Sequence, residues 1–145
     1  MIEIAYPAHP YKIREEGGRE MIFDEIRKQW LVLTPEEWVR QNFIQYLLQQ
    51  KRYPASLLAI EKEIRVGDLR KRCDVVVFKN AVPWMIVECK EMKVPLSQAT
   101  ISQVLNYNTR LQVAYLVITN GKSTYAVRIN GGKAEWVGEI PEYDR

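Results

Sequence analysis

The 145-residue sequence has few of the side chains on which disulfide scaffolds and thiolate metal sites depend. It contains two cysteines and one histidine. Cys73 and Cys89 lie in apolar segments without CxxC spacing, and His9 lies in a polar tail, which excludes a thiol–imidazole zinc site and a catalytic triad. No apolar run approaches the roughly 18 residues of a membrane-spanning helix, and the N-terminus lacks the apolar centre of a signal peptide. We therefore expect a cytoplasmic protein with no membrane partner.

The chain also lacks a large excess of either positive or negative charge. Lys and Arg number 21 and Asp and Glu number 18, which gives a net charge of +3. Hydrophobic residues make up 47% of the chain, an ordinary value for a globular protein that folds alone. The one dense basic segment is Arg70, Lys71 and Arg72, which is either a phosphate-binding patch or a solvated charged edge.

The N-terminal third of the chain divides into an arm and a helix. Residues 1–33 are expected to be an arm that packs on the core, and proline and the Gly17-Gly18 pair predict little independent structure in its first twenty residues. Residues 34–145 are expected to form a single domain. Thr34 as N-cap, followed by Pro35 and by Glu37 in a capping box, predicts a helix that runs to about Gln50. The apolar face of this helix is Val39, Phe43, Tyr46 and Leu47.

Apolar alternation predicts a strand over residues 57–66, and β-branched, apolar runs between turn signals predict strands over 73–78 and 84–90. Their short connections favour an antiparallel meander. Helical spacing predicts a second helix from Ser97 to about Leu111. A fully apolar strand at 113–119 is expected inside the sheet, followed by hairpin strands at 123–129 and 134–137. The expected fold class is α/β, with a mixed sheet of meander, further strand and hairpin, flanked by helices.

Charged residues interrupt two of these apolar strands. Asp74 leads one strand, and Glu88 and Lys90 end the next. An unpaired charge buried in a strand costs several kcal/mol of stability, so we expect these charged residues to have a functional or structural role. Side chains alternate along a strand, which places Glu88 and Lys90 on one face and lets Asp74 meet Glu88 if the strands are neighbours. Cys73 and Cys89 are then expected to lie together on the opposite face, as small core residues.

Two carboxylates and a lysine suit a divalent metal and an anionic substrate. Magnesium takes one or two carboxylates from a protein and fills its remaining positions with water and phosphate oxygen. The lysine can orient or deprotonate the attacking water, or neutralise charge on the phosphate. The alternative is a structural ion pair at a strand edge, which accounts for two of the three charges.

The same residues resemble a known family. Asp74, thirteen intervening residues and then Glu88-Cys89-Lys90 resemble the D…ExK signature of the PD-(D/E)XK nuclease superfamily, and Gln103 and Tyr107 match its QxxxY motif. With the flanking segments, residues 34–130 resemble the N-terminal nuclease domain of type I restriction enzyme R subunits, in its small stand-alone bacterial form. The resemblance implies a restriction-endonuclease-like core.

The resemblance also implies roles for individual residues. Asp74 and Glu88 would bind Mg²⁺, with Mn²⁺ as a substitute, and Lys90 would act on the nucleophile. Gln103 and Tyr107 would support the site or contact DNA. In this superfamily the helix before the sheet often supplies a further acidic residue, and the candidate here is Glu37. The alternative is that Glu37 serves only in the capping box with Thr34. The proline that often precedes the aspartate is replaced by Cys73.

The leading hypothesis is a magnesium-dependent endonuclease domain that hydrolyses DNA phosphodiesters in restriction or DNA processing, with DNA held by Arg70, Lys71 and Arg72. The second hypothesis is a non-catalytic DNA-binding or assembly module of a restriction or helicase complex. The third is a structural α/β protein whose strand-end charges only pair with each other. DNA and restriction-system or helicase subunits are the expected partners, and a homodimer is left open.

Overall fold

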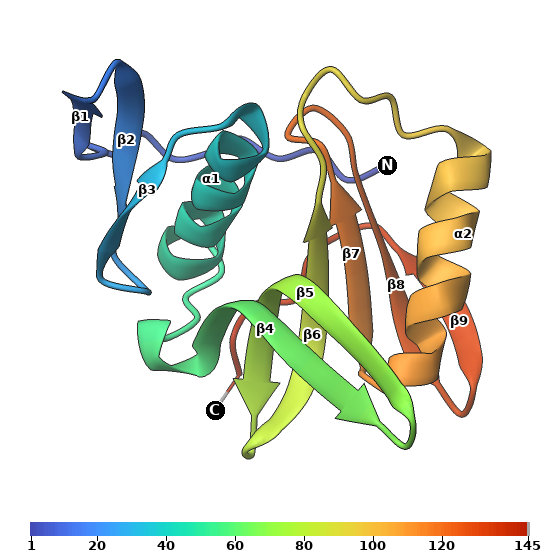
Figure 1. Ribbon diagram of the computed structural model, residues 1–145. Helices are drawn as coiled ribbons and strands as arrows, with labels where there is room; N and C mark the ends of the chain where they lie inside the picture. Colours follow the sequence, from blue (N-terminus) through green and yellow to red (C-terminus); the bar gives the residue numbers. More distant parts are fainter. Residues whose placement is uncertain (145) are drawn as a thin grey trace.

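The computed structural model describes residues 1–144, which form two sheets and two α-helices (Figure 1). The smaller sheet contains β1 (Ile13–Glu16), β2 (Arg19–Asp24) and β3 (Gln29–Val32). The larger sheet contains β4 (Leu58–Val66), β5 (Leu69–Lys79), β6 (Val82–Cys89), β7 (Tyr115–Thr119), β8 (Thr124–Asn130) and β9 (Lys133–Val137). The helices are α1 (Pro35–Gln49) and α2 (Gln98–Asn108), with short 3-10 turns at Ala55–Leu57 and Thr109–Leu111.

The larger sheet has its strands in sequence order from β4 to β9. All neighbouring pairs are antiparallel except β6 and β7, which are parallel because α2 connects them. The apolar strand β7 lies between β6 and β8, where its uniformly apolar sequence placed it. The predicted mixed sheet, made of a meander, a further strand and a hairpin, is therefore confirmed.

The two helices cover opposite faces of this sheet. Val39, Phe43 and Leu47 of α1 pack with Val75 and Val87 in one buried cluster. Ile101 and Leu105 of α2 pack with Val76, Ile86 and Leu116 in the other. Val75 and Val76 of β5, and likewise Ile86 and Val87 of β6, thus face different helices, as the two-residue period of a strand requires.

Helix α1 begins as the sequence predicts. Thr34 is the N-cap, its Oγ1 accepts the Glu37 N–H at 3.0 Å, and Pro35 opens the first turn. The predicted apolar face is fully buried. The second half of the capping box does not form, because the Thr34 N–H donates to the Val32 carbonyl at 3.1 Å. The Glu37 carboxylate is therefore free to bind elsewhere.

The N-terminal segment is more ordered than the sequence analysis expected. Strands β1 and β2 form a hairpin whose turn is Gly17-Gly18, with φ angles of 61° and 80°. Two positive φ angles are what a two-residue hairpin turn of the favoured type requires, and glycine supplies them without strain. Reading the glycine pair as a break was wrong, since it joins two paired strands. The division between arm and domain at residue 33 stays a prediction.

Strand β4 is irregular at Glu61, whose φ is 50° and which interrupts the pairing between Ile60↔Val75 and Lys62↔Cys73. The register is the same on both sides of this position, but both strands change face there: Ile60 and Val75 pack under α1, and Ile64 and Cys73 pack under α2. Cys89, in contrast, belongs to the cluster under α1. The prediction that the two cysteines lie together was wrong, although both are buried. Among residues 1–144, no helix is long and apolar enough to cross a membrane.

Candidate functional site

The structure brings Asp74 and Glu88 together on adjacent strands. Asp74 lies opposite the irregular position of β4, and its Oδ2 accepts the backbone N–H of Cys89 at 2.7 Å. This contact fixes the carboxylate of Asp74 against the end of β6, beside Glu88. Burial and then the negative charge of Asp74 raise the pKa of Glu88 to about 7. The carboxylate of Asp74 is thus close enough to oppose the ionisation of Glu88.

Glu88 is only 7% exposed, and its Oε1 has no hydrogen-bond partner in the described structure. The Nζ of Lys71 lies 3.5 Å from that oxygen, as an ion pair without hydrogen-bond geometry. A buried carboxylate oxygen without a hydrogen bond is rare in folded proteins, because burial removes the water that would otherwise solvate it. Glu88 is therefore the least satisfied acidic group of the site.

Glu88 opens into a cleft of about 430 Å³ between the sheet and α2. Both motif residues of the helix face this cleft, because Gln103 and Tyr107 are one helical turn apart. Lys90 follows β6 directly, and its backbone N–H donates to the Thr119 carbonyl at 2.8 Å. The polar side chains that line the cleft include Lys71, Glu88, Lys90, Thr100, Gln103 and Tyr107.

On the other side, Asp74 is held by Arg40 of α1. Arg40 is 4% exposed, and its Nη2 donates to Asp74 Oδ1 at 2.9 Å. The same guanidinium lies 2.6 Å from Glu37, 3.2 Å from Glu61 and 3.5 Å from Glu36. Burial opposes the charge of Arg40, but the carboxylates of Glu37 and Asp74 outweigh it and raise the pKa of Arg40. Arg40 thus stays charged and fixes the position of Asp74.

Glu37 does not face the cleft. Its carboxylate accepts from Arg27 at 3.2 Å, from Arg40 at 2.6 Å and from Gln41 at 3.1 Å. It therefore meets Asp74 only through Arg40, and it does not cap the Thr34 N–H. The structure leaves it as a buried partner of two arginines.

Glu36 is a residue that the sequence analysis missed. It is half exposed, and burial and the nearby charge of Asp74 raise its pKa, whereas Arg40 and Lys90 lower it. Of the two glutamates in the first turn of α1, Glu36 is the one whose charge interacts with both Asp74 and Lys90. The capping-box spacing drew attention to its neighbour instead.

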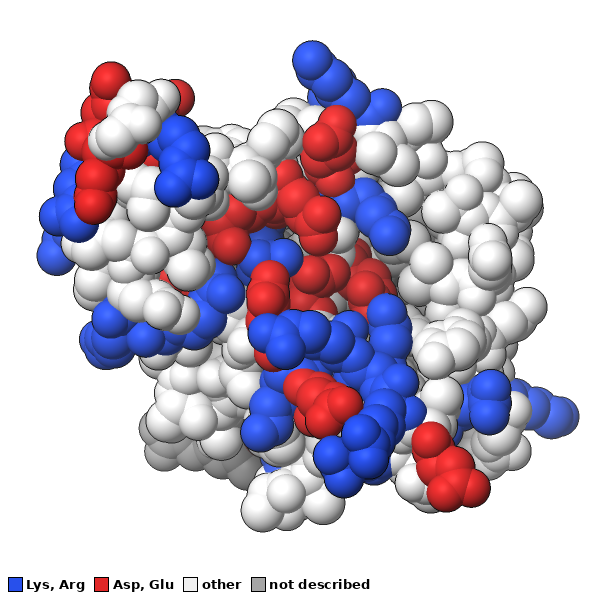
Figure 2. Space-filling model, in the orientation of Figure 1, with Lys and Arg blue, Asp and Glu red and all other residues white. Residues whose placement is uncertain are grey.

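The basic triplet does not form one surface. Arg70 and Arg72 are exposed, and Arg72 donates to Glu61 at 3.1 Å. Lys71 points to the opposite face of β5, into the cleft, because strand side chains alternate. Figure 2 shows basic side chains over the β4–β5 hairpin and acidic side chains gathered beside them near the centre of the same face.

Within residues 1–144, no group of three or more His, Cys, Asp or Glu side chains is arranged to hold a metal ion. A Mg²⁺ ion needs fewer, since it commonly takes one or two carboxylates and keeps several waters. Glu88 offers a buried oxygen that accepts no hydrogen bond, and Asp74 adds a second carboxylate beside it. These two residues fit a small divalent cation.

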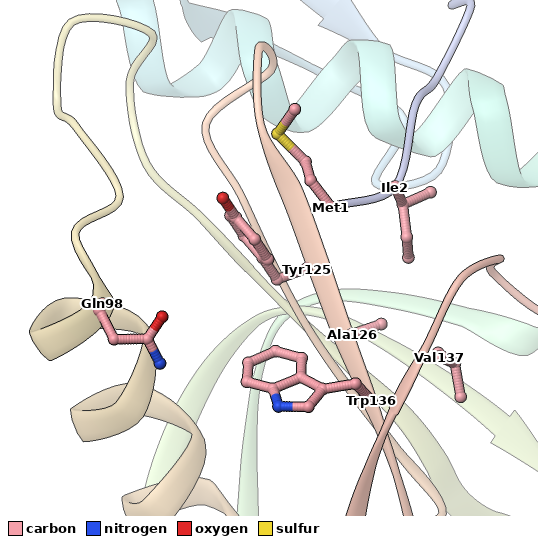
Figure 3. A pocket seen from close by; sticks show the side chains of 7 residues that line it. All are labelled: Met1, Ile2, Gln98, Tyr125, Ala126, Trp136 and Val137. Carbon is pink, nitrogen blue, oxygen red and sulfur yellow. The ribbon is translucent and has the colours of Figure 1, made fainter.

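A separate hollow of about 200 Å³ lies between the chain's beginning, the start of α2 and strands β8 and β9 (Figure 3). Its lining consists of Met1, Ile2, Gln98, Tyr125, Ala126, Trp136 and Val137, and none of these side chains is charged. It shares no residue with the cleft at Glu88. This hollow therefore offers no carboxylate, lysine or other charged side chain for acid–base or metal chemistry.

Comparison with protein families identifies a relationship that covers most of this architecture. A family model described as the type I restriction enzyme R protein N terminus (HSDR_N) matches residues 35–141. The chain belongs to this family. The matched region begins at α1 and contains both carboxylates, Lys90, Gln103 and Tyr107, whereas the N-terminal sheet lies outside it. The comparison with curated proteins found no match.

Proposed function

We propose that this chain is a metal-dependent deoxyribonuclease domain of the PD-(D/E)XK type that hydrolyses DNA phosphodiesters. The observation that carries the proposal is a buried oxygen of Glu88 that accepts no hydrogen bond and has only the Lys71 ammonium nearby, at 3.5 Å. Glu88 lies beside Asp74 and opens into a cleft that also contains Lys90. Membership of a restriction-enzyme family supports DNA as the substrate and restriction as the context. The expected location remains the cytoplasm.

Each residue has a distinct part in the proposed chemistry. Asp74 and Glu88 would hold Mg²⁺, which, when bound, acidifies water and stabilises charge on the phosphate. Lys90 follows Glu88 in the same cleft, where its ammonium group orients the attacking water and balances negative charge. Gln103 and Tyr107 face the cleft from α2 and donate hydrogen bonds to the substrate backbone.

Asp74 is suited to a fixed role rather than a mobile one. Arg40 binds one of its oxygens at 2.9 Å, and the Cys89 N–H binds the other at 2.7 Å. Each oxygen still has a lone pair for a metal ion, because a carboxylate oxygen accepts more than one contact. The metal would therefore meet a carboxylate whose orientation is already set.

The test is cleavage of supercoiled plasmid DNA by the purified chain in the presence and absence of Mg²⁺. Lys90→Met should abolish cleavage, whereas the control Lys93→Met, which removes the same charge from the exposed neighbouring loop, should cleave like the parent. Both variants should melt within a few degrees of the parent. Cleavage that persists in Lys90→Met, or that needs no metal, contradicts the proposal.

Two observations favour a second function. Both oxygens of Asp74 already accept hydrogen bonds, and no three-residue ligand group is present in the described part of the chain. These features suit a DNA-binding or assembly module that keeps the fold and works with restriction or helicase subunits. Such a module would bind the plasmid in a gel-shift experiment with no cleavage in either Mg²⁺ or Mn²⁺.

A further inference from the structure

A chain of buried charges runs from the N-terminal sheet to Asp74. It begins at Asp24, the last residue of β2, which is fully buried, and passes through Arg27, Glu37 and Arg40. Negative and positive side chains alternate along it, so each arginine lies between two carboxylates. The chain ends at Asp74, on the sheet that carries the cleft.

The first link is built into the turn between β2 and β3. Asp24 Oδ1 accepts the backbone N–H groups of Ile26 and Arg27 at 2.7 and 2.9 Å, and Asp24 Oδ2 accepts Arg27 Nε at 2.6 Å. Four contacts of one carboxylate, counting the Gln41 amide at 3.1 Å, leave it no freedom to turn. Arg27 is therefore presented to Glu37 in one orientation.

The second link joins the two arginines. Arg27 Nη2 contacts both oxygens of Glu37 at 3.2 Å, and Arg40 Nη1 takes Glu37 Oε1 at 2.6 Å. Gln41 bridges Asp24 and Glu37, with its amide 3.1 Å from each. If Arg27 were lost, Glu37 would keep only Arg40 and Gln41, and Arg40 could shift toward it and away from Asp74.

We propose that Asp24 and Arg27 are positioning residues for Asp74, so that the N-terminal sheet is part of the functional site. Buried ion pairs often stabilise a fold no more than apolar contacts of the same volume would. Stability alone therefore does not explain a series of five charges of which Asp24, Glu37 and Arg40 are buried. Each planar guanidinium, however, fixes direction as well as charge. The consequence for metal binding depends on the proposed function, whereas the consequence for the orientation of Asp74 does not.

The orientation of Asp74 has its own reporter, the Cys89 amide, which donates to Asp74 Oδ2 at 2.7 Å. The experiment records nitrogen–proton correlation spectra of the labelled full chain. The Asp74→Asn variant changes the acceptor of the Cys89 N–H, so the Cys89 amide signal is expected among those that shift in its spectrum. Arg27→Gln should shift this signal and speed its hydrogen exchange, although Arg27 is three ion pairs away. Arg14→Gln removes an exposed pair with Glu16 in the same small sheet and should leave the signal unchanged.

The second readout is Mn²⁺ affinity by calorimetry. Arg27→Gln should bind Mn²⁺ about tenfold more weakly than the parent, as expected for outer partners of a metal ligand, and Arg14→Gln should bind equally. Arg27→Lys keeps the positive charge but not the planar guanidinium group, and should bind Mn²⁺ more tightly than Arg27→Gln and more weakly than the parent. If Arg27→Gln does not fold, the Cys89 amide signal and the Mn²⁺ affinity are measured on the isosteric variant Asp24→Asn, and the same changes are expected.

The outcomes separate the two proposals. A parent that binds no Mn²⁺ contradicts the nuclease proposal, and the Cys89 signal still decides the positioning proposal. A Cys89 amide that is unchanged in both Arg27→Gln and Asp24→Asn, even with a lower melting temperature, overturns the positioning proposal and leaves the N-terminal sheet a structural addition.

Discussion

The two sides of Asp74 differ in how completely their charges are paired. On the α1 side, Arg40 is nearly inaccessible and is surrounded by the carboxylates of Glu36, Glu37, Glu61 and Asp74. On the α2 side, Glu88 has an oxygen without a hydrogen bond, and Lys90 lines an open cleft. The same carboxylate therefore belongs to a closed ionic network in one direction and to an open site in the other.

This difference suggests a division of labour. On the α1 side only the Nε of Arg40 lacks a hydrogen bond, and every charge has an oppositely charged neighbour. Such a network resists movement, whereas a buried carboxylate oxygen without a hydrogen bond gains from binding a cation. The α1 side thus holds Asp74, and under the proposed function the α2 side would receive metal and substrate. The predictions that follow test each side separately.

The largest effect is expected on the closed side. Arg40→Met replaces the guanidinium with an apolar chain of similar length, and leaves the buried carboxylate of Glu37 and the neighbouring Asp74 without their main cation. Removing one partner of a buried ion pair typically costs about 3–5 kcal/mol of stability, and urea denaturation should show a loss of that size.

The matched control is Arg70→Met, because Arg70 is an exposed arginine on β5 for which the structure shows no ion pair. Its free energy of unfolding should stay within about 0.5 kcal/mol of the parent, as is usual at the surface. Equal free energies of unfolding for the Arg40 and Arg70 variants would show that the ionic network around Arg40 does not stabilise the fold.

The open side should respond in the opposite direction. The pKa of Glu88 is raised to about 7, mainly by burial and by Asp74, so the folded protein keeps a proton on Glu88 between pH 4.5 and 7 that the unfolded chain releases. Unfolding is therefore favoured as the pH rises through this range, and the parent loses stability. Glu88→Gln cannot lose a proton and escapes this loss.

Glu88→Gln should accordingly be more stable than the parent by about 1–3 kcal/mol at pH 8, at roughly 1.4 kcal/mol per pKa unit, and nearly equal to it at pH 5. Thermal melts of both proteins at the two pH values without metal provide the measurement. If the stability difference between Glu88→Gln and the parent is the same at pH 5 and pH 8, burial and Asp74 do not raise the pKa of Glu88.

A smaller effect concerns DNA. If DNA enters on the open side, Lys71 contacts phosphate and Arg70, on the other face of β5, does not. Lys71→Ala should flatten the dependence of log affinity on log salt by about 0.9, the value for one lost phosphate contact, and Arg70→Ala should leave the slope unchanged. Fluorescence anisotropy over a salt series measures both slopes, and the reverse result would place DNA on the hairpin's outer face.

Much of the fold is predictable from sequence because it depends on local signals. The cap at Thr34, the apolar face of α1 and the alternation in β4 to β9 gave the element order after residue 34. The N-terminal hairpin was missed because Gly17-Gly18 also occurs in loops, and only the pairing partner distinguishes the two. The face exchange at Glu61 was missed because a strand irregularity leaves no clear pattern in one sequence.

In the candidate site, sequence reasoning foresaw the grouping of residues on the open side only, and their roles stay predictions. Glu88, Lys90, Gln103 and Tyr107 line one cleft because strand parity and helical spacing are local rules. The closed network was not foreseen, since Arg27 and Arg40 look like ordinary surface residues of a turn and a helix. Their burial depends on contacts between segments that are separated by 34 positions in the case of Arg40 and Asp74.

The most direct test of the account is calorimetric titration of Mn²⁺ into the full chain at pH 7.5. The parent should bind one ion, Glu88→Gln should bind at least about tenfold more weakly, and the control Glu91→Gln, which changes a neighbouring carboxylate outside the cleft, should match the parent. A parent that binds no ion, or a Glu88→Gln variant that binds as tightly as the parent, would contradict the claim that the open side of Asp74 is a metal site.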